Sequence, residues 1–165
     1  MGTQSVAEPP TAADSPAILT VGTRDGATIE MAEEAGEENF FLFGLTADQV
    51  AGSRGWYNPQ WHYDHEPETR AALDLIFSNH FSRNEPGIFE PLRETLLTSG
   101  DYYMHLADLR SYVQAQERLG DLYADQDAWA DKAILNVAGS GKFSSDRTIA
   151  EYAADIWRVA PCPVP

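Results

Sequence analysis

The sequence contains little cysteine, few basic residues and no long apolar run. Its 165 residues include one cysteine, Cys162, and a single thiol cannot close a disulfide within the chain. A reducing, cytoplasmic setting is therefore expected. No apolar stretch approaches the roughly 20 residues needed to cross a bilayer, and the first residues lack the basic start and apolar stretch of a secretory signal. We expect a soluble protein.

Positive charge is scarce. The chain has 11 lysines and arginines against 26 aspartates and glutamates, which gives a net charge of −15 at pH 7. Such a charge repels nucleic-acid phosphates and anionic membrane surfaces, so neither is expected as a partner. The length and the 43% content of hydrophobic residues are those of one folded domain.

The first half of the sequence predicts a disordered leader and then a parallel strand–helix–strand unit. Residues 1–16 are rich in proline and small polar residues without apolar periodicity, so the folded part is placed at 17–165. Apolar runs at 18–21 and 40–43, closed by Gly22 and Gly44, are typical of strands buried on both faces. A helix over 29–35, ended by Gly36, lies between them. The spacing predicts one parallel βαβ unit of an α/β fold.

The remainder is predicted to be helical, after a loop over residues 52–66. Five amphipathic helices are expected: one after Pro67, one over 88–96, one over 109–123, one from a cap at Asp127 to Gly139, and one capped by Ser145 or Asp146 and ended by Pro161. The apolar stripes expected to be buried include Leu73, Ile76, Phe77 and Phe81; Ala130, Ala133, Ile134, Val137 and Ala138; and Ile149, Tyr152, Ala153, Ile156 and Trp157. Trp129 and Tyr112 are likewise expected in the core.

Residues 139–144, Gly-Ser-Gly-Lys-Phe-Ser, resemble a phosphate-binding loop at first sight. Phe143 stands where that motif requires a hydroxyl, Asn136 stands where its first glycine belongs, and the segment follows a helix instead of a strand. A tight link between two helices, with glycine as a left-handed cap, is the favoured interpretation. Residues 22–26 follow a strand and precede a helix, where amides could face an anion. The dinucleotide pattern is absent there, so a structural turn is favoured.

Three further groups have both a chemical and a structural interpretation. His62, Asp64, His65 and Glu66 are residue types that hold zinc or iron, but without helical i, i+4 spacing of the histidines a solvated loop is favoured. The acidic residues Glu30, Glu33, Glu34, Glu37 and Glu38 suit acid–base chemistry, although such a run is usually a solvated face. His80 and His105 are expected to be ordinary surface or half-buried residues. Among the aromatic residues, Trp56 and Trp61, near Tyr57, Asn58 and Tyr63, could stack on sugars.

Two longer stretches are specific enough to suggest a family. Residues 19–23, 25–27, 30–39 and 41–44 are similar to the segment of α-glucan phosphorylases that follows their cofactor site. Later segments of the chain are similar, in the same order, to the family's last helices. These segments are Phe81-Ser82, Phe89, Tyr112-Val113, Gln116-Glu117, Leu122-Tyr123, Trp129, residues 141–149, Glu151-Tyr152, Ile156-Trp157 and Val159. The resemblance spans about residues 19–161.

The resemblance implies a fold and an activity. Family members have two Rossmann-like domains of the GT-B glycosyltransferase type, and this chain is similar to the closing part of the second, with one βαβ unit followed by about five helices. The enzymes release glucose 1-phosphate from α-1,4-glucans with inorganic phosphate and are usually homodimers. A lysine holds pyridoxal phosphate as a Schiff base, and the cofactor's 5′-phosphate acts as the acid–base group.

The chain departs from the family pattern at the cofactor. The family's lysine lies in Gly-Thr-Gly-x-Met-Lys, ten positions before the glycine that matches Gly22, and Ala12 stands there. The chain's two lysines, Lys132 and Lys142, lie outside any such motif. Residues 52–66 also depart from the pattern. We therefore predict no catalytic, cofactor-binding or metal residue, and a glycogen or starch phosphorylase fragment that is inactive alone. The alternative is a non-catalytic acidic module that binds a partner protein or glucan.

Overall fold

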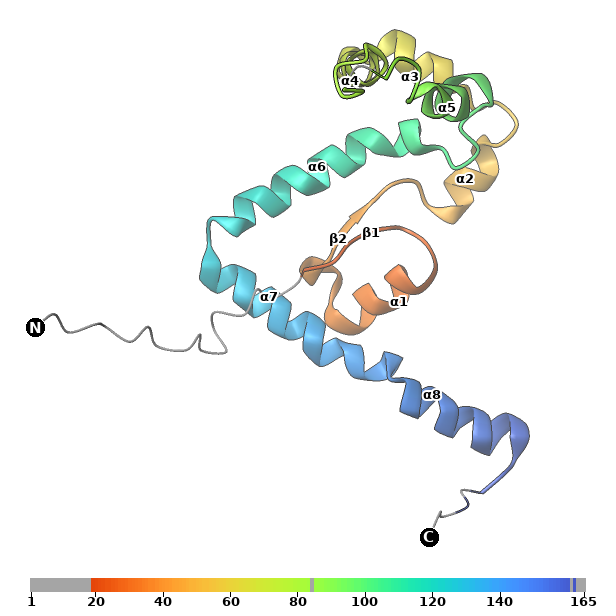
Figure 1. Ribbon diagram of the computed structural model, residues 1–165. Helices are drawn as coiled ribbons and strands as arrows, with labels where there is room; N and C mark the ends of the chain where they lie inside the picture. Colours follow the sequence, from red (N-terminus) through yellow and green to blue (C-terminus); the bar gives the residue numbers. More distant parts are fainter. Residues whose placement is uncertain (1–18, 84, 161, 163–165) are drawn as a thin grey trace, which may run out of the picture.

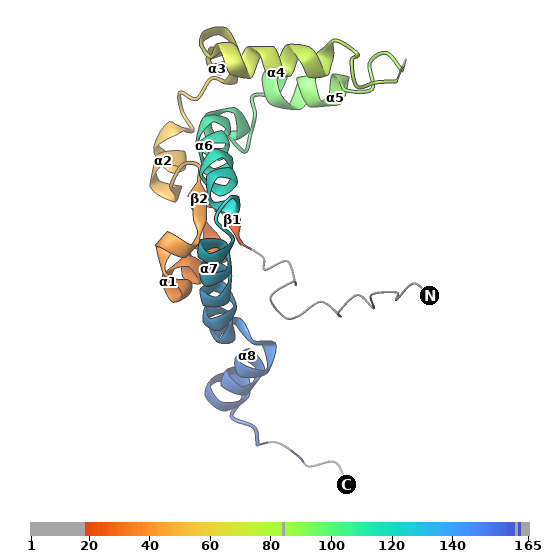
Figure 2. The same cartoon turned by 90° about the vertical axis from the view of Figure 1, so that its left-hand side faces the viewer.

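The computed structural model describes residues 19–83, 85–160 and 162. The predicted leader, Ile18 and Pro161 lie outside these ranges. The described part of the chain is extended (Figures 1 and 2). Helices α3 to α5 occupy one end, α8 occupies the other, and the two strands lie between them beside α1, α6 and α7.

The predicted βαβ unit is confirmed. Strand β1 (Val21–Thr23), helix α1 (Gly26–Ala35) and strand β2 (Phe41–Phe43) follow in order, and the strands pair in parallel with Val21 opposite Phe41. Gly36, with φ of 88°, ends α1 as expected. The first strand was predicted three residues too early, because Gly22 lies within β1 instead of closing it. Both strands are also less buried than predicted: Phe41 is buried, whereas Leu42, Phe43 and all of β1 are half-buried.

The outer edges of the two strands differ. Phe41 N donates to Thr20 O and Arg24 N donates to Phe43 O, so the N–H groups of Val21 and Thr23 point away from β2. Within the described ranges, those two amides have no hydrogen-bond acceptor. On the outer edge of β2, Phe40 N donates to Glu37 O and Gly44 N donates to Ser111 Oγ. The sheet is therefore open at β1 and partly terminated at β2.

All five predicted helices are present. They are α4 (Pro67–Phe77), α5 (Glu90–Arg93) with a π-helical continuation (Glu94–Thr98), α6 (His105–Tyr123), α7 (Gln126–Gly139), and α8 (Ser145–Glu151) with a π-helical continuation (Tyr152–Trp157). Phe81 lies beyond the end of α4 and is exposed. The caps were misplaced: Asp125 accepts from Ala128 N and caps α7, and Ser144 occupies the capping position of α8.

The predicted loop over residues 52–66 is wrong for most of its length. Helix α2 (Ala47–Ser53) begins with a capping box in which Thr46 and Gln49 bond reciprocally. Helix α3 (Pro59–His65) begins with Asn58, whose side chain accepts from Gln60 N, and with Pro59 at its first position. Local capping outweighed the glycines and the proline that suggested a loop.

The core is small and lies around the strands and α6. Its buried apolar residues are Ala32, Phe40, Phe41, Leu73, Met104, Leu106, Ala115 and Ala133. Much of the predicted core is exposed instead, including Ile134, Val137, Tyr112, Tyr152, Ile149, Ile156 and Trp157. Two short strands offer too little surface for these helices to cover, so their apolar faces remain in solvent. None of the helices in the described ranges has the length and apolarity that a membrane span requires.

Candidate functional site

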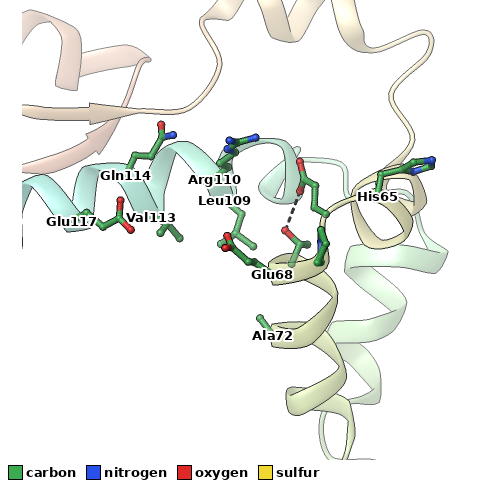
Figure 3. A pocket seen from close by; sticks show the side chains of 11 residues that line it. His65, Glu68, Ala72, Leu109, Arg110, Val113, Gln114 and Glu117 are labelled. Atoms are coloured by element: carbon green, nitrogen blue, oxygen red, sulfur yellow. Dashed lines mark hydrogen bonds between the residues drawn. The ribbon is translucent and has the colours of Figure 1, made fainter.

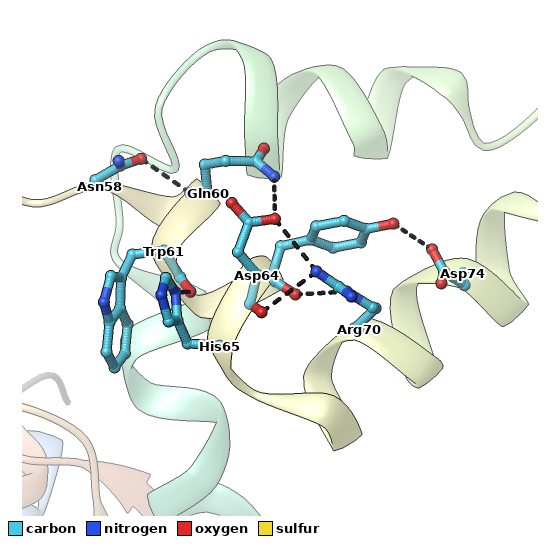
Figure 4. Close-up of polar contacts among 8 residues, drawn as sticks. Asn58, Gln60, Trp61, Asp64, His65, Arg70 and Asp74 are labelled. Atoms are coloured by element: carbon cyan, nitrogen blue, oxygen red, sulfur yellow. Dashed lines mark hydrogen bonds and ion pairs between the residues drawn. The ribbon is translucent and has the colours of Figure 1, made fainter.

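Two of the four residues predicted as possible metal ligands, Asp64 and His65, contact other residues of α3 and α4 (Figure 4). Asp64 Oδ1 accepts from Gln60 Nε2 at 3.1 Å and lies 3.3 Å from Arg70 Nη2. His65 Nδ1 lies 2.9 Å from Trp61 O, and His62 Nδ1 lies 3.1 Å from Glu66 Oε1. Among the described residues, no group of three or more histidines, cysteines or carboxylates is placed to hold a metal ion. The arrangement joins α3 to α4.

The glycine-rich segment at 139–144 links two helices, as predicted, but not through a left-handed cap. Gly139 is right-handed (φ of −69°) and a 3-10 turn over Ser140–Phe143 leads into α8. A Cβ at Gly139 would lie 3.1 Å from the backbone of Ala35. The glycine is needed because α7 and α1 approach closely there, and the segment has no phosphate-loop geometry.

Both lysines bind parts of the βαβ unit. Lys142 Nζ forms an ion pair with Glu34 Oε1 on α1. Lys132 Nζ donates to Glu38 O at 2.6 Å, and Asn136 on the same helix donates to Asn39 O at 2.8 Å. The lysines and Asn136 thus fasten α7 and the following turn to α1 and to the segment before β2.

Side-chain contacts hold the turn after β1 against α1. Thr23 Oγ1 donates to Asp25 Oδ1 at 2.7 Å, so the two side chains satisfy each other. A Cβ at Gly22 would lie 2.5 Å from the methyl group of Thr28. The first glycine is therefore explained by its contact with α1.

A polar cluster that the sequence did not reveal lies where the chain enters α6. Asp101 is 1% exposed, and its Oδ2 accepts from Tyr57 Oη and from Leu106 N, both at 2.8 Å. Its Oδ1 is buried and has no hydrogen-bond partner among the described residues. Burial, and then the bond to Asp101, raises the pKa of Tyr57 far above its ordinary value. This pair fixes the loop before α3 against the start of α6.

One turn farther along, α6 holds the end of β2. Leu45 N donates to Asp108 Oδ1 and Gly44 N donates to Ser111 Oγ, both at 2.8 Å. Gly44 has φ of 84°, and a Cβ there would lie 2.8 Å from Asp108 Oδ2. Burial raises the pKa of Asp108, against the opposing effect of the Leu45 hydrogen bond. Of these residues, only Gly44 gave a signal in the sequence, as the residue that closes a strand.

An open groove of about 540 Å³ lies between the start of α4 and α6 (Figure 3). Its lining includes three carboxylates, Glu66, Glu68 and Glu117, beside Arg110 and the apolar Leu109 and Val113. A smaller, mostly apolar cavity of about 200 Å³ lies between α1, α7 and the residues that precede the two strands. Neither cavity is lined by lysine, and the excess of carboxylates in the first makes it a poor phosphate site.

Comparison with known proteins gives the family. Residues 16–159 match the family model described as carbohydrate phosphorylase. The chain belongs to the carbohydrate phosphorylase family. The resemblance noted in its sequence is confirmed, and membership places it in a family of glycosyltransferases that includes the glycogen phosphorylases.

Alignments with individual phosphorylases show what share of their length the chain covers. It is 50% identical over 144 residues to the glycogen phosphorylase of Synechocystis sp., 47% identical over 141 residues to that of Chlamydia pneumoniae, and 49% identical over 144 residues to the human brain form. These alignments cover 86–87% of the chain and 17% of each relative. The chain therefore spans about a sixth of the length of the carbohydrate phosphorylases that it matches.

Proposed function

We propose that this chain is the carboxyl-terminal part of the second, Rossmann-like domain of an α-glucan phosphorylase with the GT-B fold, and that it does not catalyse phosphorolysis alone. The intact enzyme would be cytoplasmic and homodimeric and would release glucose 1-phosphate from α-1,4-glucan. The observation that carries the proposal is the coverage: the chain matches 17% of each relative, and it contains a phosphorylase segment without the lysine motif of the cofactor site.

The described residues do not fit pyridoxal phosphate. Schiff-base formation needs a lysine with a free amine, but Lys142 is paired with Glu34 and Lys132 donates to Glu38 O. The cofactor's phosphate also needs cationic or N–H donors, whereas the groove between α4 and α6 is lined by three glutamates and one arginine. These contacts support the assignment of the chemistry to parts of a phosphorylase that this chain does not contain.

The test is an assay of the purified chain with glycogen, inorganic phosphate and pyridoxal phosphate. An intact glycogen phosphorylase serves as the positive control and the heat-treated chain as the blank. We expect no glucose 1-phosphate above the blank and no Schiff-base absorbance. Release of glucose 1-phosphate by the chain alone would overturn the proposal.

A second candidate, a non-catalytic binding module, is favoured by the exposed apolar faces of α7 and α8. Val137 is 71% exposed and Ile156 is 63% exposed, and apolar surface of this kind commonly marks a protein interface. A phosphorylase body that lacks this segment is the partner to test. Saturable binding in a pull-down would favour the module, and its absence would favour an inert fragment.

A further inference from the structure

A group of exposed aromatic side chains lies around α3 and the start of α6. Trp56 is 75% exposed, Trp61 is 51% exposed, and Tyr102 and Tyr103 are 72% and 73% exposed. We call these four residues, together with Tyr57, the aromatic surface. Large aromatic rings that remain this accessible in a cluster are unusual on a soluble chain and mark sites of recognition.

Ring contacts hold the α3 side of this surface in place. The indole of Trp61 stacks on the imidazole of His65, with ring centroids 5.0 Å apart and planes inclined by 14°. Figure 4 shows the two rings face to face, so His65 supports one side of the indole. The imidazole of His62 lies edge-on to the indole of Trp61, with ring centroids 5.2 Å apart. The same imidazole lies 5.7 Å from the ring centroid of Tyr57. The rings are ordered by neighbours in the free chain, which lowers the entropic cost of binding a ligand.

The other side of the surface comes from a segment about 45 positions later in the chain. The Tyr57–Asp101 hydrogen bond joins the two segments. Tyr102 and Tyr103 follow Asp101 directly, with ring centroids 5.1 Å apart. The guanidinium carbon of Arg54 lies 5.8 Å from the Tyr102 centroid. Tertiary structure thus brings the rings of both segments into one neighbourhood.

We propose that the aromatic surface is a glucan-binding site. An exposed aromatic face takes the apolar C–H face of a sugar ring by stacking, while ring hydroxyls bond the polar groups nearby. Asn58 and Gln60 lie on the same segment. Asn58 Oδ1 and Gln60 Nε2 are bonded within α3, so Asn58 Nδ2 and Gln60 Oε1 are the atoms that would bond the sugar hydroxyls. The indole N–H of Trp56 is already bonded to Gly52 O at 2.8 Å, so Trp56 contributes its face.

Charge separates this ligand class from the alternatives. The net charge of −15 disfavours an anionic ligand. Arg54 already occupies the position over Tyr102 that a cationic ligand would seek. A neutral, polyhydroxylated chain meets neither obstacle. The choice of an α-1,4-linked glucan among neutral saccharides rests on the proposed function.

The experiment is a titration of the full chain with maltoheptaose, followed by calorimetry and by fluorescence of its four tryptophans. Cellohexaose, whose rings are linked in the β-1,4 manner, is the control ligand. The double variant Trp56→Ala/Trp61→Ala removes two rings of the aromatic surface. Trp157→Ala is the matched control, because Trp157 is 57% exposed and lies at the far end of the chain beyond α8. A second variant, Tyr102→Ala/Tyr103→Ala, tests the other segment.

We expect saturable binding of maltoheptaose, weakened about tenfold or more in each aromatic-surface variant and unchanged in Trp157→Ala. Circular dichroism checks that the variants keep their helices, as the exposure of the four residues predicts. Absence of binding, or equal weakening by Trp157→Ala, overturns the inference. Equal binding of cellohexaose would support a saccharide-binding site but contradict its selectivity for α-1,4-linked glucan. None of these outcomes depends on glucose 1-phosphate release, so failure here and failure of the proposed function are distinguishable.

Discussion

Tyr57 donates a hydrogen bond to Asp101 across 44 positions of sequence, and Asp101 uses the same oxygen to accept from the amide of Leu106. One buried carboxylate therefore fixes both the loop before α3 and the first turn of α6. A buried polar oxygen is costly unless it is hydrogen-bonded, so these two donors matter for stability.

Tyr57→Phe removes one of the two donors to Asp101. We expect a lower urea midpoint for the helical signal, corresponding to a loss of about 1–3 kcal/mol, because a buried carboxylate loses a partner. Tyr63→Phe is the control, since its hydroxyl bonds Asp74 at an exposed site. A similar loss in both variants would show that burial of the acceptor does not matter here.

The stability of the chain should depend on pH through the ionisation of Asp108. Burial raises its pKa above 3.8, so the folded chain binds the proton more tightly than the unfolded chain does. Stability from this group is therefore complete below pH 3.8 and falls as pH rises through the higher folded pKa. Asp108→Asn cannot ionise and keeps an oxygen for Leu45 N. Urea midpoints measured from acid to neutral pH should shift in favour of the variant as pH rises; a constant difference would contradict the assignment.

Gly139→Ala should separate α7 from α1. The added methyl would lie 3.1 Å from backbone atoms of Ala35, which cannot rotate away as a side chain can. We expect a loss of about 1–3 kcal/mol by overpacking, read from the urea midpoint. Gly120→Ala on α6 meets no atom within 4 Å, so it should stabilise its helix by about 0.5–1 kcal/mol. Stabilisation by both alanines would contradict the close approach.

The thermal transition of the isolated chain should be broad. Few apolar side chains are buried in the described ranges, and α8 contacts little besides the turn before it. Calorimetry on a sample shown to be monomeric by sedimentation should give a van't Hoff enthalpy well below that of a two-state domain of this size. A sharp, two-state transition would mean that the chain is a complete cooperative unit.

Local sequence patterns predicted the helices and strands better than they predicted which residues are buried. Apolar runs and glycines predicted β1, α1 and β2 in parallel, and helical spacing predicted α4 to α8, because these signals are carried by neighbouring residues. Gly52, Gly55 and Pro59 predict a loop where α2 and α3 lie, because they are common in turns. The capping residues Thr46 and Asn58 favour the helices that the structure has. Glycine near a helix end and proline at its first position are both compatible with helix.

Burial and the polar cluster were less accessible from the sequence. Val137 and Ile156 lie at spacing that predicts a buried stripe, but burial also requires a surface to pack against, and the pattern does not show whether one is present. Asp101 and Asp108 are not predictable from local patterns, because their partners, Tyr57 and Leu45, are more than 40 positions away. An isolated aspartate gives no sign of such a contact.

The open edge of β1 also bears on how the chain behaves in concentrated solution. Two copies that met antiparallel through β1 would satisfy the amides of Val21 and Thr23 in a four-stranded sheet. Mutual repulsion opposes that meeting, because each copy carries a net charge of −15. Added salt screens the repulsion over about 10 Å at 0.1 M. Light scattering should therefore report self-association that increases with ionic strength, so that dilute buffer, not salt, keeps the chain dispersed.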